Sequence, residues 1–217
     1  MPVILHEHIQ PQGEIGIWRI DEPEDWFLGR LDLSTAETEQ LGQIKGRRRV
    51  EWLAVRQLVH DMSGREQRGA FLKDEHGKPH LEGSAYYISI SHSRNMAAAI
   101  AAPGLVGIDI QNLVPRITHL AHKYMRPDEL ASLQEGARLE QMHVYWGAKE
   151  ALYKAYGRRA LDFCANIHIQ PFVFDPLGGQ CTGAIFKDGY EAYFRLHYSL
   201  IEDYVLVYAV EEGKAVT

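Results

Sequence analysis

The chain has 217 residues, of which 46% are hydrophobic and 24% charged, so it can bury a substantial core without disulfide bonds or a structural metal. Its net charge of −6 gives no general electrostatic reason to bind nucleic acid or an anionic membrane. No stretch approaches the roughly 18 apolar residues that span a bilayer, and the first residues lack a basic leader with a long apolar run, so we expect a cytoplasmic protein. Cys164 and Cys181 form no CxxC pair and are expected to be reduced thiols without a chemical role.

The first predicted elements are a strand and two helices. Residues 15–20 predict the strand, and Ser34 can cap a helix that has Glu37 at its third position. From Arg47 to about Met62 the sequence has no Gly or Pro and many apolar residues, which predicts a largely buried helix with a solvated basic end. The Gly that follows at position 64 should end this helix.

The middle of the chain predicts a turn and three strands. His76-Gly77-Lys78-Pro79 is typical of a turn, and residues 86–90 predict a strand with Ser91-His92-Ser93 at its end. The alanine-rich run 95–102 is too short for periodicity to separate helix from buried strand. We favour a strand, because Pro103-Gly104 would then form a hairpin turn into a strand at 105–110.

The rest of the chain predicts two helices and a set of antiparallel strands. The helices are residues 127–135 and 138–157, the second with Gly157 as its C-terminal stop. Strands rich in aromatic and β-branched residues follow at 167–174, 183–186, 190–198 and 204–210. Each half of the chain thus has one long helix with later strands, and the fold class is α+β.

Four side chains of the second half could form one phosphate-handling site. In an extended strand over residues 106–111 the apolar side chains enter a core, while Asp109 and Gln111 share the opposite face. On a helix, Glu150 and Lys154 lie one above the other. If this strand and helix pack together, two acids and an amide meet beside a Lys, a set that suits a divalent cation holding phosphates.

Each of these residues also has an ordinary structural interpretation. An Asp at a strand end commonly bonds to nearby backbone, and Glu150 four residues before Lys154 can be a surface pair worth a few tenths of a kcal/mol. Trp146 on the same helix face favours the functional interpretation, because a carboxylate on a covered face needs a partner such as a cation.

The polar residues of the first half leave two alternatives open. Ser91 and His92 point to opposite faces of a strand, and the chain has no G-x-S-x-G sequence, so a serine hydrolase is disfavoured. The segment 91–93 could bind a phosphate, or it could be a turn without a ligand. The basic run 45–49 fits a solvated helix start, although cations at a helix N-terminus favour a bound anion. Lys78 alone is typical of a surface lysine. The scattered histidines do not support a zinc site: His6, His8, His119, His122, His143 and His168.

Four segments stand in an order that matches a known family: Gly77-Lys78-Pro79, Ile90-Ser91-His92-Ser93, Val106-Gly107-Ile108-Asp109-Ile110 and Trp146-Gly147-Ala148-Lys149-Glu150-Ala151-Leu152-Tyr153-Lys154. Over roughly residues 45 to 157 the chain resembles the 4′-phosphopantetheinyl transferases of the surfactin-synthetase-activating type. The resemblance implies transfer of 4′-phosphopantetheine from coenzyme A to a serine of an apo acyl or peptidyl carrier protein, with Mg²⁺ as cofactor and adenosine 3′,5′-bisphosphate as the released product. It also implies a monomer of two similar, pseudo-twofold-related α+β halves, residues 1–104 and 105–217, with coenzyme A in the cleft between them.

The resemblance also implies roles for single residues. The metal ligands would be Asp109, Gln111 and Glu150, with Glu150 also receiving the serine proton. Lys154, joined by Lys149, would steady the pyrophosphate. The residues that hold the coenzyme A 3′-phosphate and nucleotide would be Ser91, His92, Lys78 and Arg47, or Arg48 if the alignment slips by one.

Gln111 departs from the family pattern, because surfactin-type bacterial members commonly carry Glu at this position. The site then has one negative charge fewer, so we expect weaker metal affinity than a Gln111→Glu variant would have. Two other functions fit the sequence less well. A non-catalytic coenzyme A or nucleotide-binding module is disfavoured because both Asp109 and Glu150 are present, and a metal-dependent phosphohydrolase because no denser carboxylate cluster is apparent.

Overall fold

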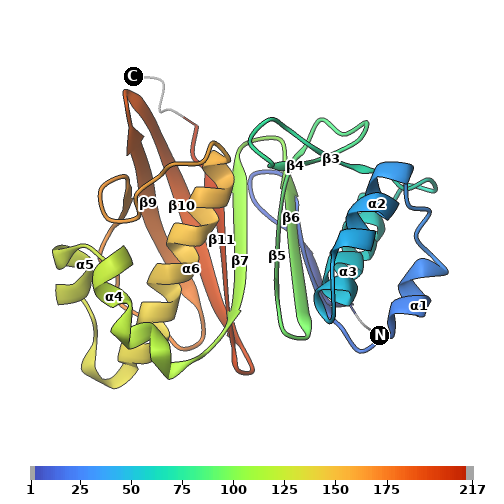
Figure 1. The fold of residues 1–217 in the computed structure, drawn as a ribbon. Helices are drawn as coiled ribbons and strands as arrows, with labels where there is room; N and C mark the ends of the chain where they lie inside the picture. The colour runs from blue at the N-terminus through green and yellow to red at the C-terminus, as the bar shows by residue number, and fades with distance from the viewer. Residues whose placement is uncertain (1–2, 214–217) are drawn as a thin grey trace. The chain divides into compact units, whose positions relative to one another are not determined.

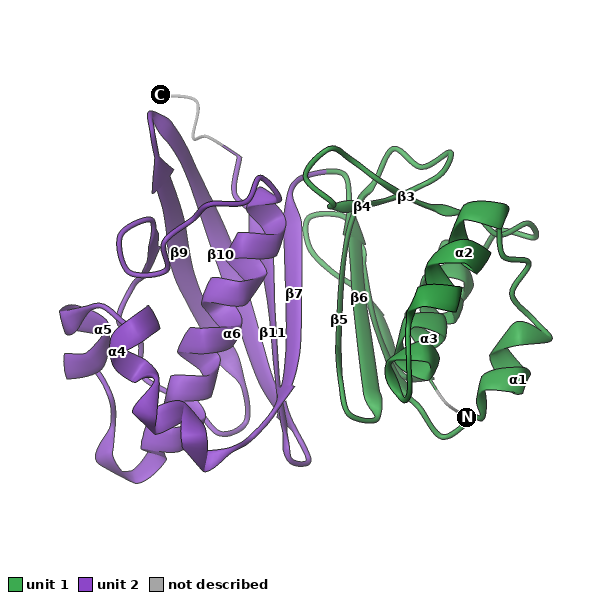
Figure 2. Ribbon diagram, viewed as in Figure 1, with its two compact units in different colours: residues 1–103 green, residues 104–217 purple. Residues whose placement is uncertain are grey.

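The computed structural model describes residues 3–213 of the chain (Figure 1). The chain divides into two compact units, Met1–Pro103 (unit 1) and Gly104–Thr217 (unit 2), and the predicted boundary after residue 104 lies next to this division (Figure 2). Each unit combines an antiparallel sheet with one long helix, as expected for an α+β protein. None of the helices in the described part of the chain is long and apolar enough to cross a membrane.

Unit 1 contains a six-stranded sheet in the order β1-β2-β6-β5-β4-β3. Helix α3 packs on this sheet through side chains such as Leu53 and Leu58, which are fully buried against Trp18 and the alanines of the sixth strand. The elements of unit 1 are β1 (Val3–His8), β2 (Glu14–Arg19), α1 (Glu24–Leu28), α2 (Thr35–Gln43), α3 (Arg48–Ser63), β3 (Phe71–Lys73), β4 (Pro79–Leu81), β5 (Tyr87–Ser93) and β6 (Met96–Ala102).

The predicted helix caps of unit 1 are confirmed. Ser34 accepts a hydrogen bond from the backbone N–H of Glu37, and the Glu37 carboxylate accepts one from the backbone N–H of Ser34. Helix α3 ends at Gly64, which adopts the left-handed conformation with φ 60°. These local signals worked because a cap satisfies backbone groups within a few residues of itself.

Unit 2 contains a five-stranded sheet in the order β7-β11-β10-β9-β8, and helix α6 lies across it (Figure 1). The predicted stop of this helix at Gly157 is confirmed, with φ 70°. The elements of unit 2 are β7 (Val106–Asn112), the 3-10 helix η1 (Pro115–His119), α4 (Ala121–Tyr124), α5 (Pro127–Ala131), the 3-10 helix η2 (Glu135–Ala137), α6 (Arg138–Tyr156), β8 (Ile167–Ile169), β9 (Gly179–Lys187), β10 (Tyr190–Ile201) and β11 (Tyr204–Glu211).

The predicted hairpin around Pro103-Gly104 is wrong, although both of its strands exist. Strand β6 pairs with β2 on one side and β5 on the other, so neither of its edges is open to β7. Strand β7 instead pairs with β11 in the other sheet. The hydrophobic pattern identified the strands, but pairing partners far away in the chain decided the sheets.

Other differences concern short or irregular segments. Helix α5 ends at Ala131, four residues before the predicted end at 135. The next residue, Ser132, forms a hydroxyl–hydroxyl hydrogen bond of 2.6 Å with Tyr145. Strand β8 stops at Ile169, because the backbone N–H of Phe174 is used by the Gln134 side chain instead of a neighbouring strand. Five short elements were not predicted, because elements of six or fewer residues show little periodicity: β1, α1, β3, β4 and α4. The pseudo-twofold relation of the halves stays a prediction.

Helix α6 and strand β7 approach so closely that only glycine fits at Gly107. A Cβ atom at this position would lie 1.8 Å from the backbone oxygen of Ala151, and backbone cannot move aside as a side chain can. We expect Gly107→Ala to lower the free energy of unfolding by about 3 kcal/mol, at the upper end of the cost of overpacking. Urea denaturation measures this difference.

The control for this prediction is Gly42→Ala in α2. No atom lies within 4 Å of a Cβ placed there, so we expect unchanged or slightly higher stability, since alanine favours helix over glycine by roughly 0.5–1 kcal/mol. Equal free energies of unfolding for Gly107→Ala and Gly42→Ala would contradict the close contact between Gly107 and the backbone of Ala151.

Candidate functional site

The predicted strand and helix of unit 2 do pack together, and they bring an acid and a lysine into contact. Asp109 lies in β7 with only 8% of its surface exposed. Lys154, near the end of α6, donates from Nζ to Asp109 Oδ1 and to the backbone oxygen of Ile108, both at 2.8 Å. A buried carboxylate needs such a partner, and Lys154 supplies it.

Glu150 lies one helical turn before Lys154 and feels the charge of Asp109. Burial raises the pKa of the Glu150 carboxyl, the negative charge of Asp109 raises it further, and Lys154 lowers it in part. Within residues 3–213 the Glu150 carboxylate makes no hydrogen bond or ion pair. The two acids together therefore carry more negative charge than Lys154 neutralises, and a cation would relieve their repulsion.

Gln111 holds the second oxygen of Asp109. Its Nε2 donates to Asp109 Oδ2 at 3.2 Å and to the backbone oxygen of His143 at 3.2 Å. Its Oε1 lies 3.0 Å from His143 Nδ1. The predicted meeting of an Asp, a Gln and a Glu near a Lys is thus present in β7 and α6, but the amide oxygen of Gln111 is directed to His143.

His143 is 1% exposed and uses both ring nitrogens. Its Nε2 lies 3.0 Å from the backbone nitrogen of Val114 and 3.1 Å from the backbone oxygen of the same residue. Burial lowers the pKa of His143, which favours the neutral ring. In that form Nδ1–H donates to Gln111 Oε1, and Nε2 accepts from the N–H of Val114.

Trp146 and Gly147 shape the surroundings of these groups. The Trp146 ring packs against Tyr124 and Phe163 with centroid distances of 5.1 and 5.7 Å. A Cβ atom at Gly147 would lie 2.7 Å from Val207 Cγ2 and 3.1 Å from Gln111 Nε2, so a larger residue would displace the amide. A cavity of about 130 Å³ opens beside Gln111, His143 and Trp146.

The carboxylates of Asp109 and Glu150 fit a hard cation such as Mg²⁺ that keeps part of its hydration shell. Among the described residues no group of three His, Cys, Asp or Glu side chains is arranged to hold a metal. Asp109 and Glu150 nevertheless supply two carboxylates whose charges act on each other, and within residues 3–213 Glu150 makes no hydrogen bond. Mg²⁺ is commonly bound by one or two carboxylates, with water and substrate phosphate oxygens completing its octahedron.

Lys149 is a correction to the predicted phosphate-binding set. Its side chain is completely buried, and Nζ contacts Glu129 Oε2 at 2.8 Å and the backbone oxygens of Phe163 and Ile167 at 2.8 and 2.9 Å. All its donors are therefore used inside the core of unit 2. Lys149 stabilises the fold and does not reach a ligand, whereas Lys154 does lie at the site.

The predicted 3′-phosphate residues of unit 1 meet around Glu51. Glu51 Oε2 lies 3.0 Å from Nδ1 of His92, at the end of β5, and Glu51 Oε1 lies 3.9 Å from Arg47 Nε. Arg47 precedes α3 and also donates to the backbone oxygen of Arg94 at 3.1 Å. Ser91 is 7% exposed while His92 is exposed, as expected for neighbours on a strand.

Arg48 and Lys78 lie nearby within unit 1. Arg48 is exposed in the first turn of α3. The turn that carries Lys78 lies beside β5 through the pairing of His80 with Tyr87, and Lys78 Nζ is 5.6 Å from the centre of the Tyr87 ring. Part of the basic run has a structural role, since Arg49 pairs with Glu24 at 2.6 Å.

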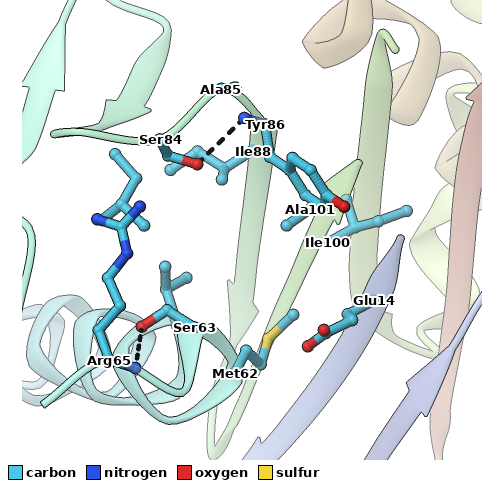
Figure 3. Close-up of a pocket in the computed structure, with 12 residues that line it drawn as sticks. Glu14, Met62, Ser63, Arg65, Ser84, Ala85, Tyr86, Ile88, Ile100 and Ala101 are labelled. Atoms are coloured by element: carbon cyan, nitrogen blue, oxygen red, sulfur yellow. Dashed lines mark hydrogen bonds between the residues drawn. The ribbon is translucent and has the colours of Figure 1, made fainter. Parts of the chain in front are cut away.

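A larger concavity of unit 1 contains none of the predicted site residues. It has a volume of about 370 Å³ and is lined mainly by apolar side chains from the end of α3 and from β5 and β6 (Figure 3). Arg65 and Glu14 lie at its rim, and the Arg65 guanidinium donates to the backbone oxygens of Glu82 and Gly83 at 2.8 Å. Its polar groups are thus used within the protein.

Three polar residues that matter for these arrangements were missed from the sequence. Glu51 faces His92, Glu129 faces Lys149, and His143 faces Gln111. An apolar helix that carries a lone charged or imidazole side chain is a signal that a partner exists. It does not say which of the many candidates elsewhere in the chain is that partner.

Comparisons with known proteins found a family model and a relative that each match part of this chain. Residues 105–209 match the model of the 4′-phosphopantetheinyl transferase superfamily. A protein of Synechocystis sp. (strain ATCC 27184 / PCC 6803 / Kazusa) with the name “Putative 4′-phosphopantetheinyl transferase” is 28% identical over 162 residues, which are 68% of this chain. The match covers 66% of that relative, just under two thirds of its length. The matched region contains the strand of Asp109 and the helix of Glu150, so this part of the chain is similar to the 4′-phosphopantetheinyl transferase superfamily.

Proposed function

We propose that this chain transfers 4′-phosphopantetheine from coenzyme A to a serine of an apo acyl or peptidyl carrier protein, as a transferase of the surfactin-synthetase-activating type. The observation that carries the proposal is the pair of acids from β7 and α6. Asp109 is held by Lys154 at 2.8 Å, and the charge of Asp109 acts on Glu150, whose carboxylate makes no hydrogen bond within the described residues. The family match over this region gives the pair its chemical context.

Asp109 and Glu150 would hold Mg²⁺ in this proposal. The bound ion would neutralise phosphate oxygens and orient the diphosphate for attack. Lys154 adds a positive charge at Asp109 and so favours the extra negative charge that develops on the diphosphate. The expectation that a Glu at position 111 would strengthen metal binding stays a prediction.

Glu150 would act as the general base. It accepts the proton of the serine hydroxyl, directly or through one water, while the serine oxygen attacks the phosphorus that carries pantetheine. The bond from that phosphorus to adenosine 3′,5′-bisphosphate breaks, and the bisphosphate leaves. Burial and the negative charge of Asp109 raise the pKa of the Glu150 carboxyl when no cation is bound.

Arg47 and His92 would recognise the 3′-phosphate of coenzyme A. Glu51 Oε2 lies 3.0 Å from Nδ1 of His92, so the other ring nitrogen is directed away from this carboxylate. Ser91, Lys78 and Arg48 would add donors to the nucleotide. Dephospho-coenzyme A has no 3′-phosphate to accept charge-assisted hydrogen bonds from Arg47 and His92, so it should be the poorer substrate.

Mass spectrometry of an apo carrier protein tests the proposed function. The carrier is incubated with the chain, coenzyme A and Mg²⁺, and we expect it to gain the mass of one phosphopantetheine group. A carrier with its acceptor Ser replaced by Ala is the control and should gain nothing. Coenzyme A binding without a mass gain would indicate a binding module, and nucleotide release without a carrier would indicate a hydrolase. Either result would overturn the transferase.

A further inference from the structure

A continuous chain of hydrogen bonds connects the backbone after β7 to the Asp109 carboxylate. It begins at the N–H of Val114, passes through the His143 ring at 3.0 Å on each side, and continues through Gln111 to Asp109 Oδ2 at 3.2 Å. Gln111 is half-buried, and His143 is 1% exposed. The resemblance implies a metal-ligand role for Gln111 and no role for His143.

The orientation of the Gln111 amide follows from its neighbours. Its nitrogen faces two acceptors, Asp109 Oδ2 and the backbone oxygen of His143, each at 3.2 Å. The reversed amide would place Oε1 against both of these oxygens and would lose two hydrogen bonds. With Nε2 fixed in this way, Oε1 faces His143 Nδ1 at 3.0 Å.

We propose that Gln111 is a positioning residue that donates to Asp109 instead of coordinating the cation, and that His143 fixes Gln111 in this orientation. This inference rests on the proposed function, because it concerns the cation that Asp109 and Glu150 would hold. It differs from the expectation drawn from the sequence, in which Gln111 is itself a ligand. The protein then gives the cation two carboxylates, and water and phosphate oxygens supply the remaining ligands.

The arrangement explains why two different donors hold Asp109. Lys154 bonds Oδ1 and Gln111 bonds Oδ2, so both ends of the carboxylate are fixed and the group cannot rotate about its terminal bond. Each oxygen retains lone pairs for a cation, because an ionised carboxylate accepts at about four sites. Partners of this kind orient metal ligands in many proteins, and their loss typically weakens metal binding 10–100-fold.

Two substitutions of His143 separate the bond to Gln111 from the bond to Val114. In His143→Asn the amide nitrogen can stand near the position of Nδ1 and still donate to Gln111, while the bond to Val114 is lost. In His143→Gln the longer side chain can place its oxygen near the position of Nε2 and accept from Val114, while the donor to Gln111 is lost. The two variants are therefore each other's control.

The experiment measures Mn²⁺ binding to the purified chain by electron paramagnetic resonance of the free ion, without coenzyme A or carrier. We expect His143→Gln to raise the dissociation constant about 10-fold and His143→Asn to change it less than about 3-fold. Thermal unfolding of the same proteins should show the opposite order, with His143→Asn the less stable. If His143 had only a structural role, the less stable variant, His143→Asn, would also bind Mn²⁺ more weakly. That result would overturn the inference.

Gln111→Leu provides a second measurement that does not depend on His143 variants folding. It should also weaken Mn²⁺ binding about 10-fold, and adding His143→Gln to it should cause no further loss, because His143 acts through Gln111. Additive losses would contradict this connection. If the unaltered chain shows no Mn²⁺ binding that Asp109→Asn removes, the metal site of the proposed function is wrong. If Asp109→Asn removes Mn²⁺ binding but His143→Gln binds Mn²⁺ as tightly as the unaltered chain, only the positioning role is wrong.

Discussion

Glu150→Gln is expected to reduce the rate of phosphopantetheine transfer by about 10²–10⁴-fold, the usual contribution of a general base. Gln has nearly the same shape as Glu, so the packing of α6 should be retained. The amide cannot accept the serine proton, and it removes one of the two charges that would hold a divalent cation beside Asp109. The rate of mass gain of an apo carrier protein, at saturating coenzyme A and Mg²⁺, measures the loss.

Glu135→Gln serves as the matched control, because Glu135 is exposed in η2 and undergoes the same chemical change. Its transfer rate should equal that of the unaltered chain. Transfer by Glu150→Gln within a few-fold of this control would show that the acid pair is not the reaction centre. Circular dichroism of both variants should match the parent protein and so exclude unfolding as the cause.

Lys149→Met is expected to lower the free energy of unfolding by about 3–5 kcal/mol, because it leaves the Glu129 carboxylate buried without its cation. Glu129 and Lys149 are both completely buried, with 2.8 Å between Nζ and Oε2. Burial lowers the pKa of Lys149 and the nearby Glu129 raises it again in part, as expected for a buried ammonium held by one carboxylate and two backbone oxygens. Urea denaturation measures the loss.

Two further variants test this explanation. Lys187→Met removes a lysine from an exposed pair with Asp188 and should cost less than about 1 kcal/mol. Adding Glu129→Gln to Lys149→Met should recover part of the stability, because no uncompensated charge then remains. A stable Lys149→Met with weakened coenzyme A binding would restore the role that the sequence suggested for this lysine.

Local signals predicted the parts of the fold that a few neighbouring residues decide. The capping box at Ser34, the glycine stops at Gly64 and Gly157, and the strand that carries Asp109 are confirmed, since each depends on side chains or dihedrals close in sequence. Helical spacing also identified the face of α6 that carries Glu150, because residues four apart share a face.

Long-range choices could not be predicted in the same way. Strand β7 pairs with β11, almost one hundred residues later, rather than with the adjacent β6. Lys149 stands three residues after Trp146 but one before Glu150, so spacing alone left it at the border of the polar face. Its partner Glu129 lies on another helix, and only the coordinates show that Lys149 turns inward to it.

The contact between Gly107 and the backbone of Ala151 has a consequence for the distance between the two acids. Asp109 is two residues from one side of this contact, and Glu150 is the immediate neighbour of the other. Backbone touching backbone sets their separation, and no flexible side chain lies between to act as a spacer. The carboxylates are therefore preorganised, so that little reorganisation energy would be spent on bringing them together when a ligand arrives.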